Sequence, residues 1–160
     1  MSFKSKTNAA TLAAGVLLGA GYLVYALGRH APAPNDLQSW AAAILIFIGI
    51  GIGAAVLAQI AFHIALAVGT AVKENGADEG KIKRAIAATV AEDEMDKLIA
   101  LKSTHFGYML AGLGFVAALV ALVCGAAAVN ALHILFGASL LGSLAEGALS
   151  IWFYEKGVRK

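Results

Sequence analysis

Glu146 is the residue best suited to carry chemistry, because its carboxylate lies inside a long apolar stretch. It stands within Leu140–Leu149, and the closest basic residue is Lys156. A carboxylate at membrane depth is costly, and such residues usually face a bundle interior and mark an ion, proton or substrate path. We therefore expect Glu146 to be a proton- or ligand-coupled group, with a structural interhelical hydrogen bond as the alternative.

Three further polar side chains are predicted to share the level of Glu146 in the bundle: Gln59, His63 and His105. At the rise of an α-helix, Glu146 lies about 23 Å from the outer end of its apolar stretch, and Gln59 about 27 Å from the outer end of its own. His63 lies one turn deeper, and His105 marks the entry of the third stretch. Two histidines alone are weak evidence for a metal or haem site, so no metal or cofactor is expected.

Four apolar stretches must position these groups: 9–27, 41–72, 106–128 and 131–153. Each has the length of about 20 residues that a helix needs to cross a bilayer. Of 12 Lys and Arg residues, only Arg29 falls between the first two stretches, and the turn Val129-Asn130 has none. Basic residues collect on the cytoplasmic side, so both termini and the loop Lys73–His105 are predicted to be cytoplasmic.

Composition supports an all-α integral membrane protein in a lipid bilayer, with residues 1–160 forming one membrane domain. Hydrophobic residues make up 60% and charged residues 14%, and the mean hydropathy is +0.79. These values lie far from those of soluble domains. No nucleophile–base pair or metal cluster is visible, so we expect neither an enzyme nor a nucleic-acid-binding protein.

The N-terminus has an alternative interpretation as a secretory signal. Two lysines precede the apolar run, and Ala31-Pro32-Ala33 has the form of a cleavage site. The run is longer than a signal peptide's apolar region, and Pro34 would follow the cut, so the first span is expected to be retained.

The second and third apolar stretches are predicted to extend into the cytoplasm as long helices. A helix from about Leu37 to Glu74 would be about 57 Å long, well beyond the roughly 30 Å hydrocarbon core. Its start can be capped by Asn35, Asp36 or Ser39. No helix breaker separates Leu98 from Phe106, so the third helix is predicted to run from near Val90 to about Ala128.

The loop Lys73–His105 is predicted to be structured and charged, which suits the docking of a protein partner. Lys81–Ala88 has the pattern of a short amphipathic helix, and Thr89–Glu92 has the form of a capping box. The basic residues can also meet anionic lipid headgroups. The candidate docking residues are Lys81, Lys83, Arg84, Glu92, Asp93, Glu94, Asp96 and Lys97.

Small residues four positions apart predict close helix packing within the membrane. Gly49 and Gly53 form one such pair, and Gly142 with Ala138 forms another. Small residues at this spacing let helix backbones approach closely. Such contacts matter in a bilayer, because burial of apolar surface does not by itself favour association of helices there. We expect contacts inside one bundle, with a homodimer face as the alternative.

The C-terminal half resembles a family of small prokaryotic four-helix membrane proteins of unknown function. Members carry an acidic D-E-R-D-x-x-I-x-x-K-A segment before helix three, a Ser/Ala-Glu pair in helix four and a Tyr-x-x-Gly ending. The matching residues here are Asp93-Glu94, Asp96-Lys97, Ala145-Glu146 and Tyr154–Gly157, with Met95 in place of the Arg. The resemblance implies a bacterial or archaeal plasma membrane protein, some relatives being encoded beside helix-turn-helix regulators, and no known reaction.

From these features we expect a non-enzymatic membrane protein that binds a partner or senses a ligand. Its loop Lys73–His105 would dock a transcription regulator or another membrane subunit. The alternative is a small proton-coupled transporter, because one membrane carboxylate can hold a proton and a cationic substrate in turn. Against the transporter, both prolines of the chain precede Leu37, so no span is broken by proline.

Overall fold

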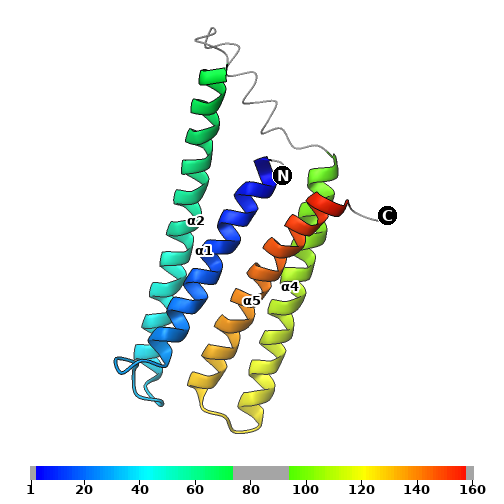
Figure 1. Ribbon diagram of the computed structural model, residues 1–160. Helices are drawn as coiled ribbons and strands as arrows, with labels where there is room; N and C mark the ends of the chain where they lie inside the picture. The colour runs from blue at the N-terminus through cyan, green and yellow to red at the C-terminus, as the bar shows by residue number, and fades with distance from the viewer. Residues whose placement is uncertain (1–2, 74–93, 158–160) are drawn as a thin grey trace.

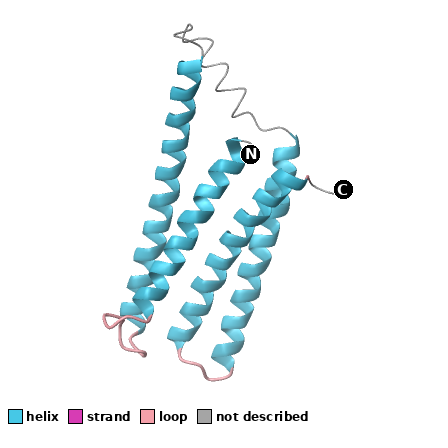
Figure 2. Cartoon of the chain, viewed as in Figure 1, coloured by secondary structure: helices cyan, strands magenta, loops and turns pink. Residues whose placement is uncertain are grey.

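The computed structural model describes residues 3–73 and 94–157, and these form four helices without a strand (Figure 2). They are α1 (Phe3–Ala26), α2 (Leu37–Lys73), α4 (Glu94–Val123) and α5 (Ala128–Lys156) (Figure 1). All four are long and apolar enough to cross a membrane. The prediction of an all-helical, multi-pass membrane protein is confirmed at this level. The predicted short helix Lys81–Ala88 and the capping box Thr89–Glu92 lie outside the described residues.

The four helices form two antiparallel hairpins, α1–α2 and α4–α5, that share their ends (Figure 1). One end of the bundle, called here the terminal end, contains the start of α1, the end of α2, the start of α4 and the end of α5. The connections α1–α2 and α4–α5 lie at the other, the loop end. Helix α5 packs against all three other helices, and α4 packs chiefly on α5. The residues of α5 therefore lie at the centre of the bundle.

The start of α2 is capped by Asp36, one of the three candidates from sequence. Its Oδ1 accepts a hydrogen bond from the backbone N–H of Ser39 at 3.0 Å. An aspartate three residues ahead satisfies one of the N–H groups that have no partner within a helix. Helix α2 then continues without interruption to Lys73, in agreement with the predicted length of this element.

The turn between α4 and α5 was predicted at Val129-Asn130, and that prediction is wrong. Helix α4 ends at Val123, and α5 already begins at Ala128. Gly125 has φ +84°, the N–H of Gly125 donates to the Leu122 carbonyl, and the N–H of Ala126 donates to the Ala121 carbonyl. These are the bonds of a Schellman motif, which needs a residue of positive φ after the helix. A glycine therefore places the turn, not the polar Asn130.

An aromatic layer closes the loop end. Tyr22, Ile44 and Phe136 form a buried cluster, and the Tyr22 hydroxyl is 2.5 Å from Nδ1 of His133. Trp40 packs edge-on against the His133 ring at 4.5 Å between ring centroids, and its Nε1–H donates to the Ala33 carbonyl at 3.1 Å. Aromatic rings with one polar atom suit the boundary between hydrocarbon and water. Helices α1, α2 and α5 are joined here.

Close helix packing is found on α5, where small residues meet its neighbours. A Cβ built on Gly142 would lie 2.7 Å from the carbonyl oxygen of Gly107 on α4, and Gly114 lies against Ala138. These contacts bring the α4 and α5 backbones together.

Gly49 and Gly53 do not make the helix contact that was expected of them. No atom lies within 4 Å of a Cβ built on either residue, whereas Gly51 between them faces Leu18 of α1. Each residue of an α-helix is rotated by about 100° from the one before, so residues two positions apart point in nearly opposite directions. Gly51 therefore faces α1, and Gly49 and Gly53 face outward.

Candidate functional site

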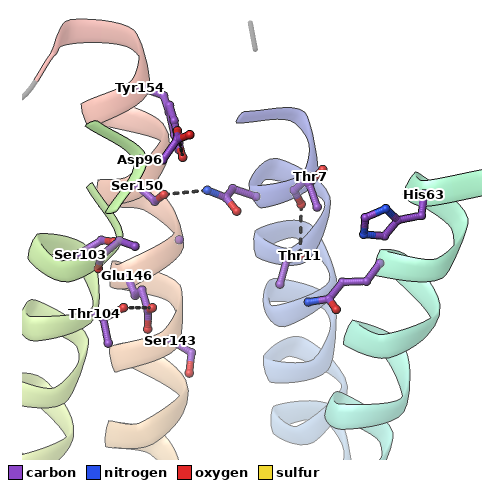
Figure 3. A pocket seen from close by; sticks show the side chains of 14 residues that line it. Thr7, Thr11, His63, Asp96, Ser103, Thr104, Ser143, Glu146, Ser150 and Tyr154 are labelled. Atoms are coloured by element: carbon purple, nitrogen blue, oxygen red, sulfur yellow. Dashed lines mark hydrogen bonds between the residues drawn. The ribbon is translucent and has the colours of Figure 1, made fainter. Parts of the chain in front are cut away.

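A polar cavity of about 610 Å³ lies between the helices towards the terminal end (Figure 3). All four helices contribute to it, and most of its lining side chains carry a hydroxyl, an amide, an imidazole or a carboxylate. The polar lining residues are Thr7, Asn8, Thr11, Gln59, His63, Asp96, Ser103, Thr104, Ser143, Glu146, Ser150 and Tyr154. Gln59, His63 and Glu146, three of the four predicted site residues, therefore line one cavity.

Glu146 is half-buried and held from the neighbouring helix. The Thr104 hydroxyl of α4 donates a hydrogen bond of 2.6 Å to its Oε1 (Figure 3). A Cβ on Gly107 would lie 3.2 Å from its Oε2, so the absence of a side chain at Gly107 leaves room for the carboxylate. Because Gly142 lies one turn before Glu146, the close crossing of α4 and α5 brings Thr104 within reach of Glu146.

A second carboxylate is positioned by the same pair of helices. The Tyr154 hydroxyl of α5 donates a hydrogen bond of 2.8 Å to Oδ1 of Asp96 on α4. Asp96 lies eight residues before Thr104, and Tyr154 lies eight residues after Glu146, as two antiparallel helices in continuous contact require. The sequence predicts Asp96 as a docking residue, and in the structure Asp96 lines the polar cavity.

Helix α1 joins the cavity through a hydrogen bond that sequence analysis missed. The Asn8 amide Nδ2–H donates to the Ser150 hydroxyl of α5 at 2.6 Å (Figure 3). Ser150 is buried, and a buried hydroxyl needs such a partner. In the sequence, Asn8 and Ser150 are visible only as polar residues at the start of one apolar stretch and near the end of another. Whether they form a hydrogen bond depends on the register between α1 and α5.

Gln59 and His63 of α2 also line the cavity, and the His63 ring points towards α1 (Figure 3). They are one turn apart on α2, so they fall on one face. His105 does not line the cavity and is exposed. The next position after Thr104 is rotated by roughly 100° about α4, which explains its separation from Glu146.

The described lining is anionic or neutral. It contains the carboxylates Asp96 and Glu146, the imidazole His63, and no Lys or Arg. The part of the chain that the structure describes also holds no group of three or more His, Cys, Asp or Glu residues able to hold a metal ion. The carboxylates of the described lining attract positively charged groups.

The polar cavity occupies the terminal half of the bundle. Along α5, its lining extends from Tyr154 to Ser143, which is about 16 Å at the rise of an α-helix. Another ten residues, or about 15 Å, separate Ser143 from His133 of the aromatic layer. Two cavities with largely apolar linings are lined by residues of that interval, and one of them shares Ser143 with the polar cavity. The polar cavity thus ends near the middle of the bundle.

Of the candidate docking residues, Lys81, Lys83, Arg84, Glu92 and Asp93 lie outside the described residues. Lys97 Nζ is 3.1 Å from Oε1 of Glu94, and both side chains are largely exposed. An exposed pair of this kind contributes little to stability. Partner docking at this loop stays a prediction.

Comparison with protein-family models, curated proteins and solved structures finds no match to this chain. The resemblance to small prokaryotic four-helix membrane proteins also stays a prediction.

Proposed function

We propose that this protein is a multi-pass plasma membrane protein that binds a cation in its polar cavity and exchanges it for protons across the membrane. One observation carries the proposal: a polar cavity in the terminal half of an apolar bundle is lined by Glu146, which brings a carboxylate to it. The proposal takes the transporter alternative over partner docking, because the cavity and the contact between Thr104 and Glu146 are formed by described residues.

The distribution of basic residues supports an orientation for the cavity. Of 12 Lys and Arg residues, 11 lie at positions 4–6, 73–102 or 156–160 of the sequence, and only Arg29 lies between α1 and α2. Basic residues favour the cytoplasmic side. Both termini are then cytoplasmic, the end of α2 and the start of α4 extend into the cytoplasm, and the polar cavity lies in the cytoplasmic half of the bundle.

The chemistry of Glu146 supports exchange. A carboxylate can release its proton to bind a cation and regain a proton when the cation leaves, so one group serves both species in turn. The Thr104 hydroxyl, which donates to Oε1 at 2.6 Å, orients the carboxylate without adding a charge. Binding of the cation and of the proton is therefore mutually exclusive, which is the requirement for coupled exchange.

The helix arrangement supports a route for access from the other side. No described helix is broken within its span, so access cannot depend on an unwound segment of the kind many transporters use. The α1–α2 hairpin contacts the α4–α5 hairpin mainly through α5. We propose that rocking of one hairpin against the other closes the cytoplasmic cavity and opens the aromatic layer.

Uptake of radiolabelled guanidinium into proteoliposomes tests this function. Guanidinium keeps its charge at all working pH values, so it does not cross bilayers as a neutral base. With an inside-acid pH gradient, wild-type protein should accumulate the label above protein-free vesicles, and Glu146→Gln should abolish this accumulation. Glu155→Gln is the matched control, because Glu155 is exposed on α5 and does not line the cavity.

The proposal fails if Glu146→Gln transports as well as the wild type, or if accumulation is independent of the pH gradient. Wild-type protein and Glu146→Gln should elute at the same volume in size-exclusion chromatography. This result would show that a loss of transport reflects the missing carboxylate and not misfolding.

A further inference from the structure

We propose that the cation path continues from the polar cavity into a second cavity at Ser143 and leaves the bundle at the loop end, past a gate formed by Tyr22 and His133. This inference rests on the proposed function and adds the second half of the path and the residues that close it. It follows from two cavities that share a lining residue and from the hydrogen bond beyond them.

The second cavity has a volume of about 320 Å³ and extends towards the loop end. On α5 its lining runs from Ser143 to Leu132, which is about 16 Å at the rise of an α-helix. Because Ser143 lines both cavities, they adjoin at this residue, about one turn from Glu146 (Figure 3). The two linings together extend from Tyr154 to Leu132, along nearly the whole of α5.

The lining of the second cavity is largely apolar, which makes the cavity a barrier to ions in the observed state. Leucine, isoleucine and phenylalanine side chains form most of it, and its polar residues are Ser139 and Ser143. The Ser139 hydroxyl donates to the Leu135 carbonyl of its own helix at 2.8 Å. Apolar constrictions stop ions by excluding water. Coupled exchange needs such a barrier, because a permanently open path would let the cation leak.

The buried aromatic cluster closes the second cavity on the side of the loop end. Ile44 and Phe136 line this cavity and pack with Tyr22 in the cluster. The Tyr22 hydroxyl of α1 is hydrogen-bonded to Nδ1 of His133 on α5 at 2.5 Å, and Trp40 of α2 packs on the His133 ring. Tyr22 and His133 therefore hold the two hairpins together where the path would leave the bundle.

The contact between α1 and α5 can shift more easily than the contact between α4 and α5. A Cβ on Gly15 would lie 2.9 Å from Cδ2 of Leu144, and a Cβ on Gly19 would lie 2.8 Å from Cδ2 of Leu140. Leucine side chains of α5 thus rest on glycines of α1, and packed helices slide by small adjustments of such side chains. At Gly142, by contrast, backbone meets backbone. We therefore expect the α1–α2 hairpin to move against a fixed α4–α5 pair.

Labelling of Ser143→Cys from outside intact cells tests the gate. The background is Cys124→Ala, and the probe is a trimethylammonium methanethiosulfonate, a thiol reagent that is itself a membrane-impermeant cation. Tyr22→Phe removes the hydroxyl and keeps the ring, so external labelling should become about 3- to 20-fold faster, as expected for loss of one interhelical hydrogen bond. Tyr25→Phe is the matched control and should leave the rate unchanged. The Tyr25 ring packs in the same aromatic layer, but its hydroxyl makes no hydrogen bond within the described part of the chain.

Guanidinium uptake into proteoliposomes tests the second half of the path. Leu135 lines the second cavity but not the polar cavity, so Leu135→Phe should narrow the path and reduce uptake about ten-fold or more. Guanidinium binding at Glu146, measured by calorimetry in nanodiscs, should stay within about two-fold of wild type, because distant sites act independently. Retained binding also shows that the variant is folded. Leu141→Phe is the control and should change neither quantity, since Leu141 is exposed and lines neither cavity.

Equal external labelling in the Tyr22→Phe and Tyr25→Phe proteins would overturn the proposed path, as would equal uptake by Leu135→Phe and Leu141→Phe. Either result leaves the proposed function standing if guanidinium accumulation still requires Glu146. Accumulation that survives Glu146→Gln would instead overturn the proposed function itself.

Discussion

Gly107 on α4 and Gly142 on α5 face each other so closely that neither position has room for a side chain. A Cβ on Gly142 would lie 2.7 Å from the Gly107 carbonyl oxygen, and a Cβ on Gly107 would lie 3.0 Å from the Gly142 carbonyl oxygen. The obstacle is backbone in both directions, so it cannot move aside as a flexible side chain would. This crossing lies one turn from the hydrogen bond between Thr104 and Glu146.

Gly142→Ala should separate α4 from α5 and destabilise the protein by about 1–3 kcal/mol, the usual range for overpacking. Thermal unfolding in detergent, followed by circular dichroism, measures this. Gly112→Ala is the matched control, since a Cβ there meets no atom within 4 Å. Equal stability of the two variants would contradict the observed crossing.

Thr104→Val should weaken cation binding at Glu146 while preserving side-chain volume. The variant removes the hydroxyl that donates to Oε1 at 2.6 Å. Interhelical hydrogen bonds in membranes contribute about 0.6–1.7 kcal/mol, so guanidinium affinity should fall about 3- to 20-fold. Thr104→Ser should restore binding, and failure of Ser to do so would indicate that packing rather than the hydroxyl matters.

A membrane-impermeant maleimide should report the orientation of the bundle and of its polar cavity. Cys124 is exposed at the loop end and should react when the reagent is added outside intact cells. Ser143→Cys in a Cys124→Ala background places the thiol at the inner end of the polar cavity. It should react only when the reagent reaches the cytoplasmic side. Rapid external labelling of this variant would contradict both the cavity and the topology.

The stabilisation that the Asp36 cap gives to the start of α2 should depend on pH in the acidic range. Hydrogen bonds from the side chain and backbone of Ser39 lower the pKa of Asp36 below its ordinary value of 3.8. Because the folded-state pKa is the lower one, the stabilisation is complete above 3.8 and is lost as the pH falls through the folded-state value.

Hydrogen exchange at the Ser39 amide, corrected for the intrinsic rate, measures the loss of this cap. Protection should fall on acidification in the wild type and stay constant in Asp36→Asn, since asparagine also caps helices but does not titrate in this range. Equal pH dependence in both proteins would exclude Asp36 as its source.

The sequence predicted the four helices because length and hydropathy are local properties of the chain. Hydrophobic stretches long enough to span a membrane, and an acidic residue just before Leu37, indicated where α2 begins and that it is long. Heights along each helix also followed from the constant rise per residue. Gln59, His63 and Glu146 could therefore be assigned to neighbouring levels before any contact was known.

The tertiary structure alone decided which side chains meet. Rotation about a helix axis relative to its neighbours depends on packing between residues distant in sequence, as at Gly107 and Gly142. That packing turns Asp96 into the cavity and leaves His105 outside it. Gly49 likewise faces away from the bundle because Gly51 faces Leu18. The height of a residue along its helix is set by its position in the sequence, but the direction in which its side chain points is set by packing against the neighbouring helix. The polar cavity could therefore be identified only in the folded bundle.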